Sequence, residues 1–190
     1  MLDQWRIAMK SAITVILFAV SALAQDQNAV VAAQSACGPA PVSFAVRADA
    51  TQHPTPAPDP DKALVFVVED LGQCVDCYGG RSIVGDVTAA LVKVGMDGSW
   101  IGANQGSSYL FFAATPGEHH LCANWQSRLE ERARSFAMVS FTAEAGKVYY
   151  FRIRLFPGQG DFAFDLDPIN SDQGKYLVAS SAYSVSHPKK

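Results

Sequence analysis

VYYFRIRL, residues 148–155, is the stretch that decides the fold class of this 190-residue chain. Its apolar residues recur with a period of two, which is typical of a β-strand buried on one face. We predict that four side chains face the core: Tyr149, Phe151, Ile153 and Leu155. Arg152 and Arg154 then point the other way, into solvent, because a shift of one residue would bury both charges unpaired.

Short β-type runs continue on both sides of this stretch. Residues 63–68 (ALVFVV) are apolar and β-branched, which is typical of a strand buried on both faces. Asp97-Gly98 predicts a type I′ hairpin, because that turn needs positive φ at both positions. Further strands are expected at 42–46, 91–96, 99–101, 108–114, 119–126, 136–142 and 162–167.

Two segments have helical character instead. Ser171–Ala182 begins with Ser171 and Asp172 as capping candidates and predicts a helix near the C-terminus. Ser127–Arg134 has good helix formers and is either a helix or a long hairpin tip. The whole pattern predicts a mainly β fold, a single antiparallel β-sandwich of prealbumin-like or Ig-like type with a short C-terminal helix.

Residues 1–24 are typical of a cleaved export signal. An apolar run at 11–22 follows two basic residues, and Ala22-Leu23-Ala24 before Gln25 is a small-x-small cleavage pattern. The run is shorter than the ~20 residues that span a bilayer. We therefore predict an exported protein, periplasmic or extracellular, whose mature form does not span the membrane.

The mature chain is expected to form one domain preceded by a leader. Residues 25–61 are predicted to be this leader, with one possible strand. Thr51–Asp61 (TQHPTPAPDPD) carries four prolines in eleven residues, so it should form neither helix nor strand and act as an extended linker. The β-sandwich domain is then expected to cover residues 62–190.

Four cysteines allow three disulfide pairings. Because export leads to an oxidising compartment, we predict two structural disulfides, Cys37–Cys122 and Cys74–Cys77. The alternative is a thiol–disulfide or metal-binding protein that uses the Cys74-x-x-Cys77 loop. In its zinc form, one of two neighbouring histidines, His119 or His120, would join Cys74 and Cys77, together with a further ligand.

The remaining residues predict no catalytic site, no metal and no cofactor. The net charge is −3 without a long basic run, which argues against nucleic-acid binding. Asp165 and Asp167 share a strand face, but alternating surface acids explain them equally well. Trp100 and Trp125 have the chemistry to stack on a sugar or peptide, although burial is the commoner role of tryptophan.

Residues 116–121 (PGEHHL), followed by 145–152 (AGKVYYFR), resemble a bacterial family catalogued as domain of unknown function 2846. The resemblance covers about residues 62 to 180 and lies in the order and spacing of turns and strands. It implies a small exported β-sandwich, similar to prealbumin-like modules of envelope proteins, and brings no known activity. We therefore expect a non-catalytic accessory or binding module of the cell envelope, with an envelope protein or a glycan as its partner.

Overall fold

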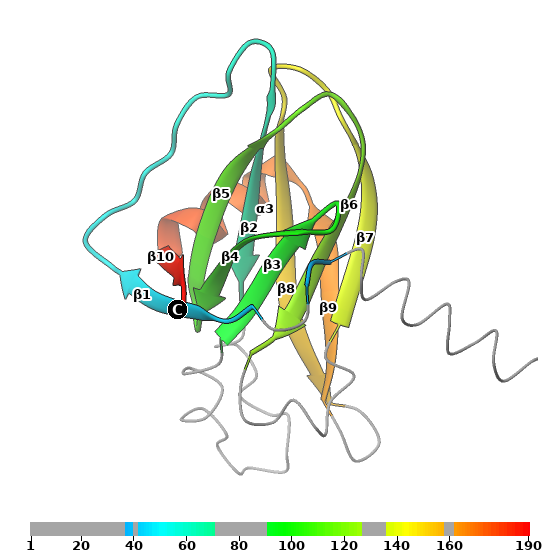
Figure 1. Cartoon of the computed structure of the whole chain (residues 1–190). Helices are drawn as coiled ribbons and strands as arrows, with labels where there is room; N and C mark the ends of the chain where they lie inside the picture. Colours follow the sequence, from blue (N-terminus) through cyan, green and yellow to red (C-terminus); the bar gives the residue numbers. More distant parts are fainter. Residues whose placement is uncertain (1–36, 40–41, 71–90, 127–135, 158–161) are drawn as a thin grey trace, which may run out of the picture. The chain divides into compact units, whose positions relative to one another are not determined.

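The computed structural model of the protein describes residues 37–39, 42–70, 91–126, 136–157 and 162–190. These residues form ten strands in two sheets and one helix (Figure 1). The elements are β1 (Phe44–Asp49), β2 (Ala63–Glu69), β3 (Leu91–Met96), β4 (Ser99–Gln105), β5 (Ser108–Ala114), β6 (Gly117–Trp125), β7 (Phe136–Ala143), β8 (Val148–Pro157), β9 (Phe162–Ile169), α3 (Ser171–Ser180) and β10 (Ala182–Pro188). The prediction of a mainly β fold with two sheets is confirmed.

The two sheets differ in strand direction. The four-stranded sheet has the order β4-β3-β6-β7 and is antiparallel throughout. The six-stranded sheet has the order β1-β10-β5-β2-β8-β9, and two of its pairs, β2–β8 and β10–β5, are parallel. The expectation of a purely antiparallel sandwich is therefore wrong in this sheet. The strands of each parallel pair are far apart in sequence, so no tight hairpin forces them to run in opposite directions.

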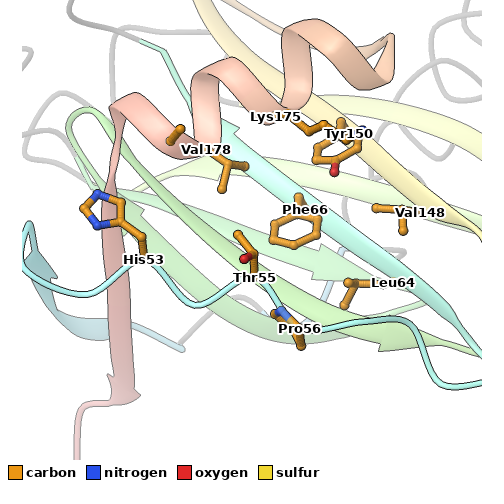
Figure 2. A pocket seen from close by; sticks show the side chains of 10 residues that line it. His53, Thr55, Pro56, Leu64, Phe66, Val148, Tyr150, Lys175 and Val178 are labelled. Atoms are coloured by element: carbon orange, nitrogen blue, oxygen red, sulfur yellow. The ribbon is translucent and has the colours of Figure 1, made fainter.

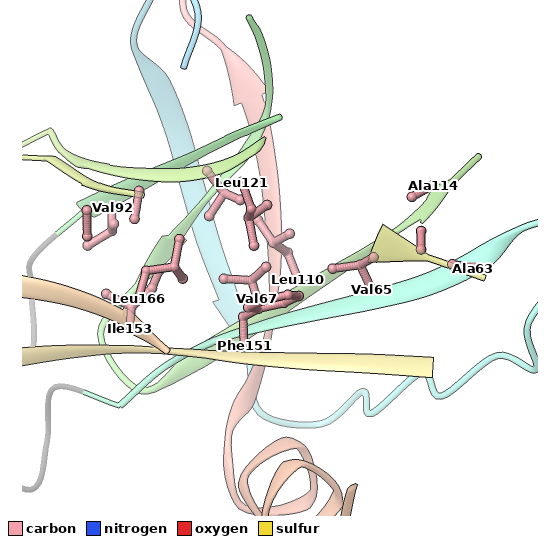
Figure 3. Close-up of a cluster of buried hydrophobic side chains, with 14 of the residues drawn as sticks. Ala63, Val65, Val67, Val92, Leu110, Ala114, Leu121, Phe151, Ile153 and Leu166 are labelled. Carbon is pink, nitrogen blue, oxygen red and sulfur yellow. The ribbon is translucent and has the colours of Figure 1, made fainter. Parts of the chain in front are cut away.

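Two clusters of buried side chains hold the layers together, and β2 contributes to both. Alternate residues of β2, including Val65 and Val67, point into the core between the sheets, where Phe151 and Leu121 meet them (Figure 3). The other β2 residues pack on the outer face, under α3, in a cluster formed by Leu64, Phe66, Val68, Tyr109, Tyr150 and Val178. The prediction that residues 63–68 are buried on both faces is confirmed.

The C-terminal segment differs from the prediction. The helix ends at Ser180 rather than Ala182, its N-cap is Asn170, and the chain continues into β10. β10 pairs with β1 on one side and with β5 on the other. Polar residues mark its inner face: the Ser184 hydroxyl donates to the Ala103 carbonyl of β4 at 2.8 Å. This strand is missing from the sequence prediction because hydrogen bonds replace the apolar alternation that identifies a half-buried strand.

The segment expected to be a leader contributes to the sandwich. β1 is an edge strand of the six-stranded sheet, and residues 36–190 form one compact unit. The strand expected at 42–46 is observed at Phe44–Asp49. Residues 50–62, which include the proline-rich stretch, form neither helix nor strand, as predicted.

In β8, the inward and outward faces are as predicted, but the environment of the two arginines is not. Phe151 and Ile153 are buried in the core, and Tyr149 packs against it; the Leu155 side chain lies outside the described residues. Arg152 is only 17% exposed and lies 3.9 Å from Asp70, while Arg154 is ion-paired with Asp167. The expectation of solvated arginines is wrong, because carboxylates from the end of β2 and from β9 lie beside them.

Gly174 allows α3 to lie directly on Tyr150. A methyl group at Gly174 would overlap the Tyr150 ring. Alanine normally favours a helix over glycine by about 1 kcal/mol, whereas forcing extra atoms into a packed site costs about 1–3 kcal/mol. We therefore expect Gly174→Ala to lower the free energy of unfolding by up to about 2 kcal/mol, measured by urea denaturation. Gln173→Ala, at the exposed neighbouring position, should change it by less than about 0.5 kcal/mol. A stabilising Gly174→Ala would show that α3 is not seated on this ring.

Candidate functional site

A pocket of about 520 Å³ lies on the outer face of the six-stranded sheet (Figure 2). Its volume is within the range of ~300–1,000 Å³ that is usual for small-molecule sites. Three parts of the chain line it. β2 and β8 supply the floor (Leu64, Phe66, Val148 and Tyr150), α3 one wall (Lys175, Val178 and Ala179), and the proline-rich segment the other (His53, Thr55 and Pro56).

Tyr109 holds the proline-rich wall in place. Its side chain is fully buried, and its hydroxyl donates a hydrogen bond to the Pro54 carbonyl at 3.1 Å. Burial, together with the neighbouring Tyr183, raises the pKa of Tyr109 to about 12. The hydroxyl therefore stays protonated and remains a donor at any physiological pH. The prolines add to this order because their fixed φ leaves less conformational freedom to lose.

The floor of the pocket is aromatic and closely packed. The rings of Phe66 and Tyr150 are stacked at a centroid distance of 5.2 Å and an interplanar angle of 13°. Phe66 also contacts Tyr109 and Phe111 at 6.2 and 5.6 Å. Burial raises the pKa of Tyr150, so this hydroxyl also stays protonated. The floor is thus an apolar surface with one hydroxyl donor at its edge.

Charge around the pocket has one sign. Among the described residues that line the pocket, the basic side chains are Lys175 and His53, and both are exposed. Figure 2 shows His53 and Lys175 at opposite ends of the pocket, with Tyr150 next to Lys175. No acidic residue is present among the lining residues that the structure describes. The pocket therefore favours an apolar ligand that carries no positive charge.

Glu69 is a second unusual group, buried between the sheets at the end of β2. It is fully buried, and neither carboxyl oxygen hydrogen-bonds to a described residue. Burial raises the pKa of Glu69 well above its usual range. The nearby backbone N–H of Gly106 favours the charged carboxylate, although it does not make a hydrogen bond, and it offsets only part of the rise in pKa. Glu69 is thus stabilised as the neutral acid. Asn104, also buried, donates to the Val67 carbonyl at 3.1 Å, and its Oδ1 has no described donor.

The raised pKa of Glu69 predicts a loss of stability as pH rises. Above the unfolded pKa of about 4.3, the unfolded chain releases this proton while the folded chain keeps it, so the free energy of unfolding falls. Each pH unit between the two pKa values is worth about 1.4 kcal/mol. We expect Glu69→Gln to be more stable than the unmodified protein at pH 7.5 and similar to it at pH 4, by urea denaturation. Glu118→Gln, at an exposed position, should show no such difference. Identical pH profiles for the unmodified and Glu69→Gln proteins would contradict the assignment.

The two neighbouring histidines, His119 and His120, have different environments. His119 is buried; its Nδ1 lies 2.6 Å from Asp97 Oδ2 and its Nε2 lies 2.7 Å from the Thr115 carbonyl. Burial alone would lower the pKa of His119, but these two hydrogen bonds and the Asp97 charge raise it above the ordinary value. His120 is exposed, and its Nδ1 lies 3.0 Å from the Ser140 hydroxyl.

This cluster fits a structural role better than a catalytic or metal role. Asp97 and Gly98 have φ of 52° and 79°, which confirms the predicted type I′ turn, and His119 ties this turn to Thr115. Asp97 accepts a hydrogen bond from the backbone N–H of His120, and no carboxylate among the described residues hydrogen-bonds to the His120 ring as in a catalytic triad. Both nitrogens of His119 are already engaged, and the described residues contain no group of three metal-ligand side chains.

Among the cysteines, the structure places Cys37 and Cys122 at disulfide distance, with Cα atoms 5.4 Å apart. This agrees with the expected pairing of these two residues. Cys74 and Cys77 lie outside the described residues, as does the segment 127–134. No helix among the described residues is long and apolar enough to span a membrane.

The other candidates from the sequence have structural contacts. Trp125 is buried in the core, and the Trp100 indole N–H donates to the Pro39 carbonyl at 2.8 Å. Asp165 and Asp167 both lie beside Arg154, so they neutralise a neighbouring charge on β8. These contacts give the two tryptophans and the two aspartates structural roles.

Sequence reasoning missed the residues that matter most here, Glu69 and the pocket lining. Glu69 follows ALVFVV in phase with Val65 and Val67, so its inward position could have been read from the period of two. For the pocket, the only signal was a strand buried on both faces, which requires a further layer over the sheet. Comparison of the chain with protein-family models, curated proteins and solved structures finds no match.

Proposed function

We propose that this protein is an exported, non-catalytic binding module of the cell envelope, and that the pocket under α3 is its ligand site. The pocket of about 520 Å³ carries the proposal. Its apolar floor and few polar edge groups are the usual features of a small-molecule site. No hydrogen bond joins its described titratable side chains, Lys175, His53 and Tyr150, so the lining offers no paired nucleophile and base.

Export is supported by the N-terminal sequence and by the Cys37–Cys122 pair, which is compatible with an oxidising compartment. We also propose, from the motifs at 116–121 and 145–152, that the chain is related to the family of domain of unknown function 2846. Intact mass of the secreted or periplasmic form tests the export part. A chain that begins at Gln25 supports it, and a retained Met1 refutes it.

Binding at the pocket is tested with the neutral fluorescent probe N-phenyl-1-naphthylamine. We expect saturable, one-site binding with increased probe fluorescence, because the aromatic floor excludes water. Ala179→Trp places a large ring at a lining position and should abolish this binding. Ser180→Trp, at the exposed neighbouring position that does not line the pocket, is the matched control and should leave binding unchanged. Absence of saturable binding, or equal loss in both variants, would refute the proposal.

A further inference from the structure

We infer that the ligand of this pocket is an anionic amphiphile, a carboxylate on a single alkyl chain, with its headgroup between Lys175 and the Tyr150 hydroxyl. The inference rests on the proposed binding function and names the class of ligand. It follows from three observations on the same set of side chains: the apolar floor, the sign of the charge at the rim, and an unused hydroxyl donor.

The floor determines the apolar part of the ligand. Leu64, Phe66 and Val148 present hydrocarbon to the pocket from two adjacent strands, and Val148 is 37% exposed. Covering such a surface with an alkyl chain is favourable because it removes apolar area from water. Because the pocket is lined by apolar groups along its length in Figure 2, an extended chain covers more of it than a compact polar ligand does.

The rim determines the charge. Lys175 follows Gly174, which sits against the Tyr150 ring, and Figure 2 shows Lys175 next to that ring. None of the described residues that line the pocket is acidic, so these side chains leave the Lys175 charge uncompensated. A carboxylate placed there gains a charge-assisted contact, whereas an ammonium headgroup would be repelled.

The Tyr150 hydroxyl supplies the directional contact. It lines the pocket and has no hydrogen-bond partner among the described residues. A phenol that remains protonated can donate to a carboxylate oxygen but offers less to an alkylammonium group. Lysine and tyrosine at the same end of the pocket thus select an acceptor headgroup and fix which end of the ligand lies there.

The test compares three ten-carbon probes by titration calorimetry, below their micelle-forming concentrations: decanoate, decan-1-ol and decyltrimethylammonium. We expect decanoate to bind about 5- to 10-fold more tightly than the alcohol, and the cation most weakly. Lys175→Gln should weaken decanoate binding several-fold and leave decan-1-ol unchanged. Lys189→Gln, an exposed lysine that does not line the pocket, is the control and should alter neither. Added salt should reduce the preference for decanoate, since the lysine is exposed.

The outcomes separate this inference from the proposed function. Equal affinity for decanoate and decan-1-ol, or tighter binding of the cation, overturns the anionic ligand while the pocket remains a binding site. Binding of N-phenyl-1-naphthylamine without binding of decanoate also overturns the ligand class alone. If the naphthylamine and all three probes fail to bind, both the inference and the proposed function are wrong. An equal loss of both ligands in Lys175→Gln would refute the headgroup contact.

Discussion

Replacement of both Cys37 and Cys122 by alanine is expected to lower the free energy of unfolding by about 4–5 kcal/mol in urea denaturation. The two residues are 85 positions apart, so the crosslink closes a long loop and removes much conformational freedom from the unfolded chain. It also fastens the chain before β1 to the outer face of the four-stranded sheet. There the Trp100 indole N–H donates to the Pro39 carbonyl, and the Lys93 ammonium donates to the Val42 carbonyl at 3.2 Å.

The matched control is the double replacement of Cys74 and Cys77 by alanine. If these two are paired, they close a loop of only a few residues, and their loss should cost about 2 kcal/mol or less. Peptide mapping under non-reducing conditions accompanies both urea denaturation measurements and identifies the disulfide pairs. A crosslink from Cys37 to Cys74 or Cys77, or equal destabilisation by the two double variants, would contradict the expected pairing.

Local signals predicted most of the sandwich. The alternation in 148–155 identified the inward face of β8, and Asp97-Gly98 identified a hairpin whose turn residues both have positive φ. The apolar run 63–68 identified the strand that is buried on both faces. These features depend on residues close in sequence, whose residue types and spacing directly indicate a turn or a strand face.

Features that depend on residues far apart in the sequence could not be predicted from such local patterns. β2 and β8 pair in parallel although about 80 residues separate them, and no turn residue encodes that pairing. β10 has serine rather than apolar residues on its inner face, so it lacks the usual strand signal. The pocket combines a proline-rich segment, two central strands and the C-terminal helix, which only tertiary structure brings together. The proposed function thus depends on the part of the fold that sequence patterns describe least.

Phe151→Ala is expected to lower the free energy of unfolding by about 3–5 kcal/mol, because it removes a large side chain from the centre of the core. Phe151 is 1% exposed and lies among residues of both sheets. Its ring meets the Phe141 ring edge to face at a centroid distance of 5.0 Å, so the truncation also removes an aromatic contact between β8 and β7. The surrounding β-branched side chains, such as Val65 and Val67, are too stiff to fill the cavity.

Arg152→Ala, at the next residue of the same strand, is the control for this prediction. Arg152 is on the opposite face, and its ion pair with Asp70 at 3.9 Å is long, so its loss should cost about 1 kcal/mol. Its Nε is buried without an acceptor among the described residues, and removing that donor offsets part of the cost. The ratio of the two effects tests the register of β8. If Arg152→Ala were the more damaging change, the face of β8 that carries Arg152 would be the tightly packed one, and the inward assignment of Phe151 would be wrong.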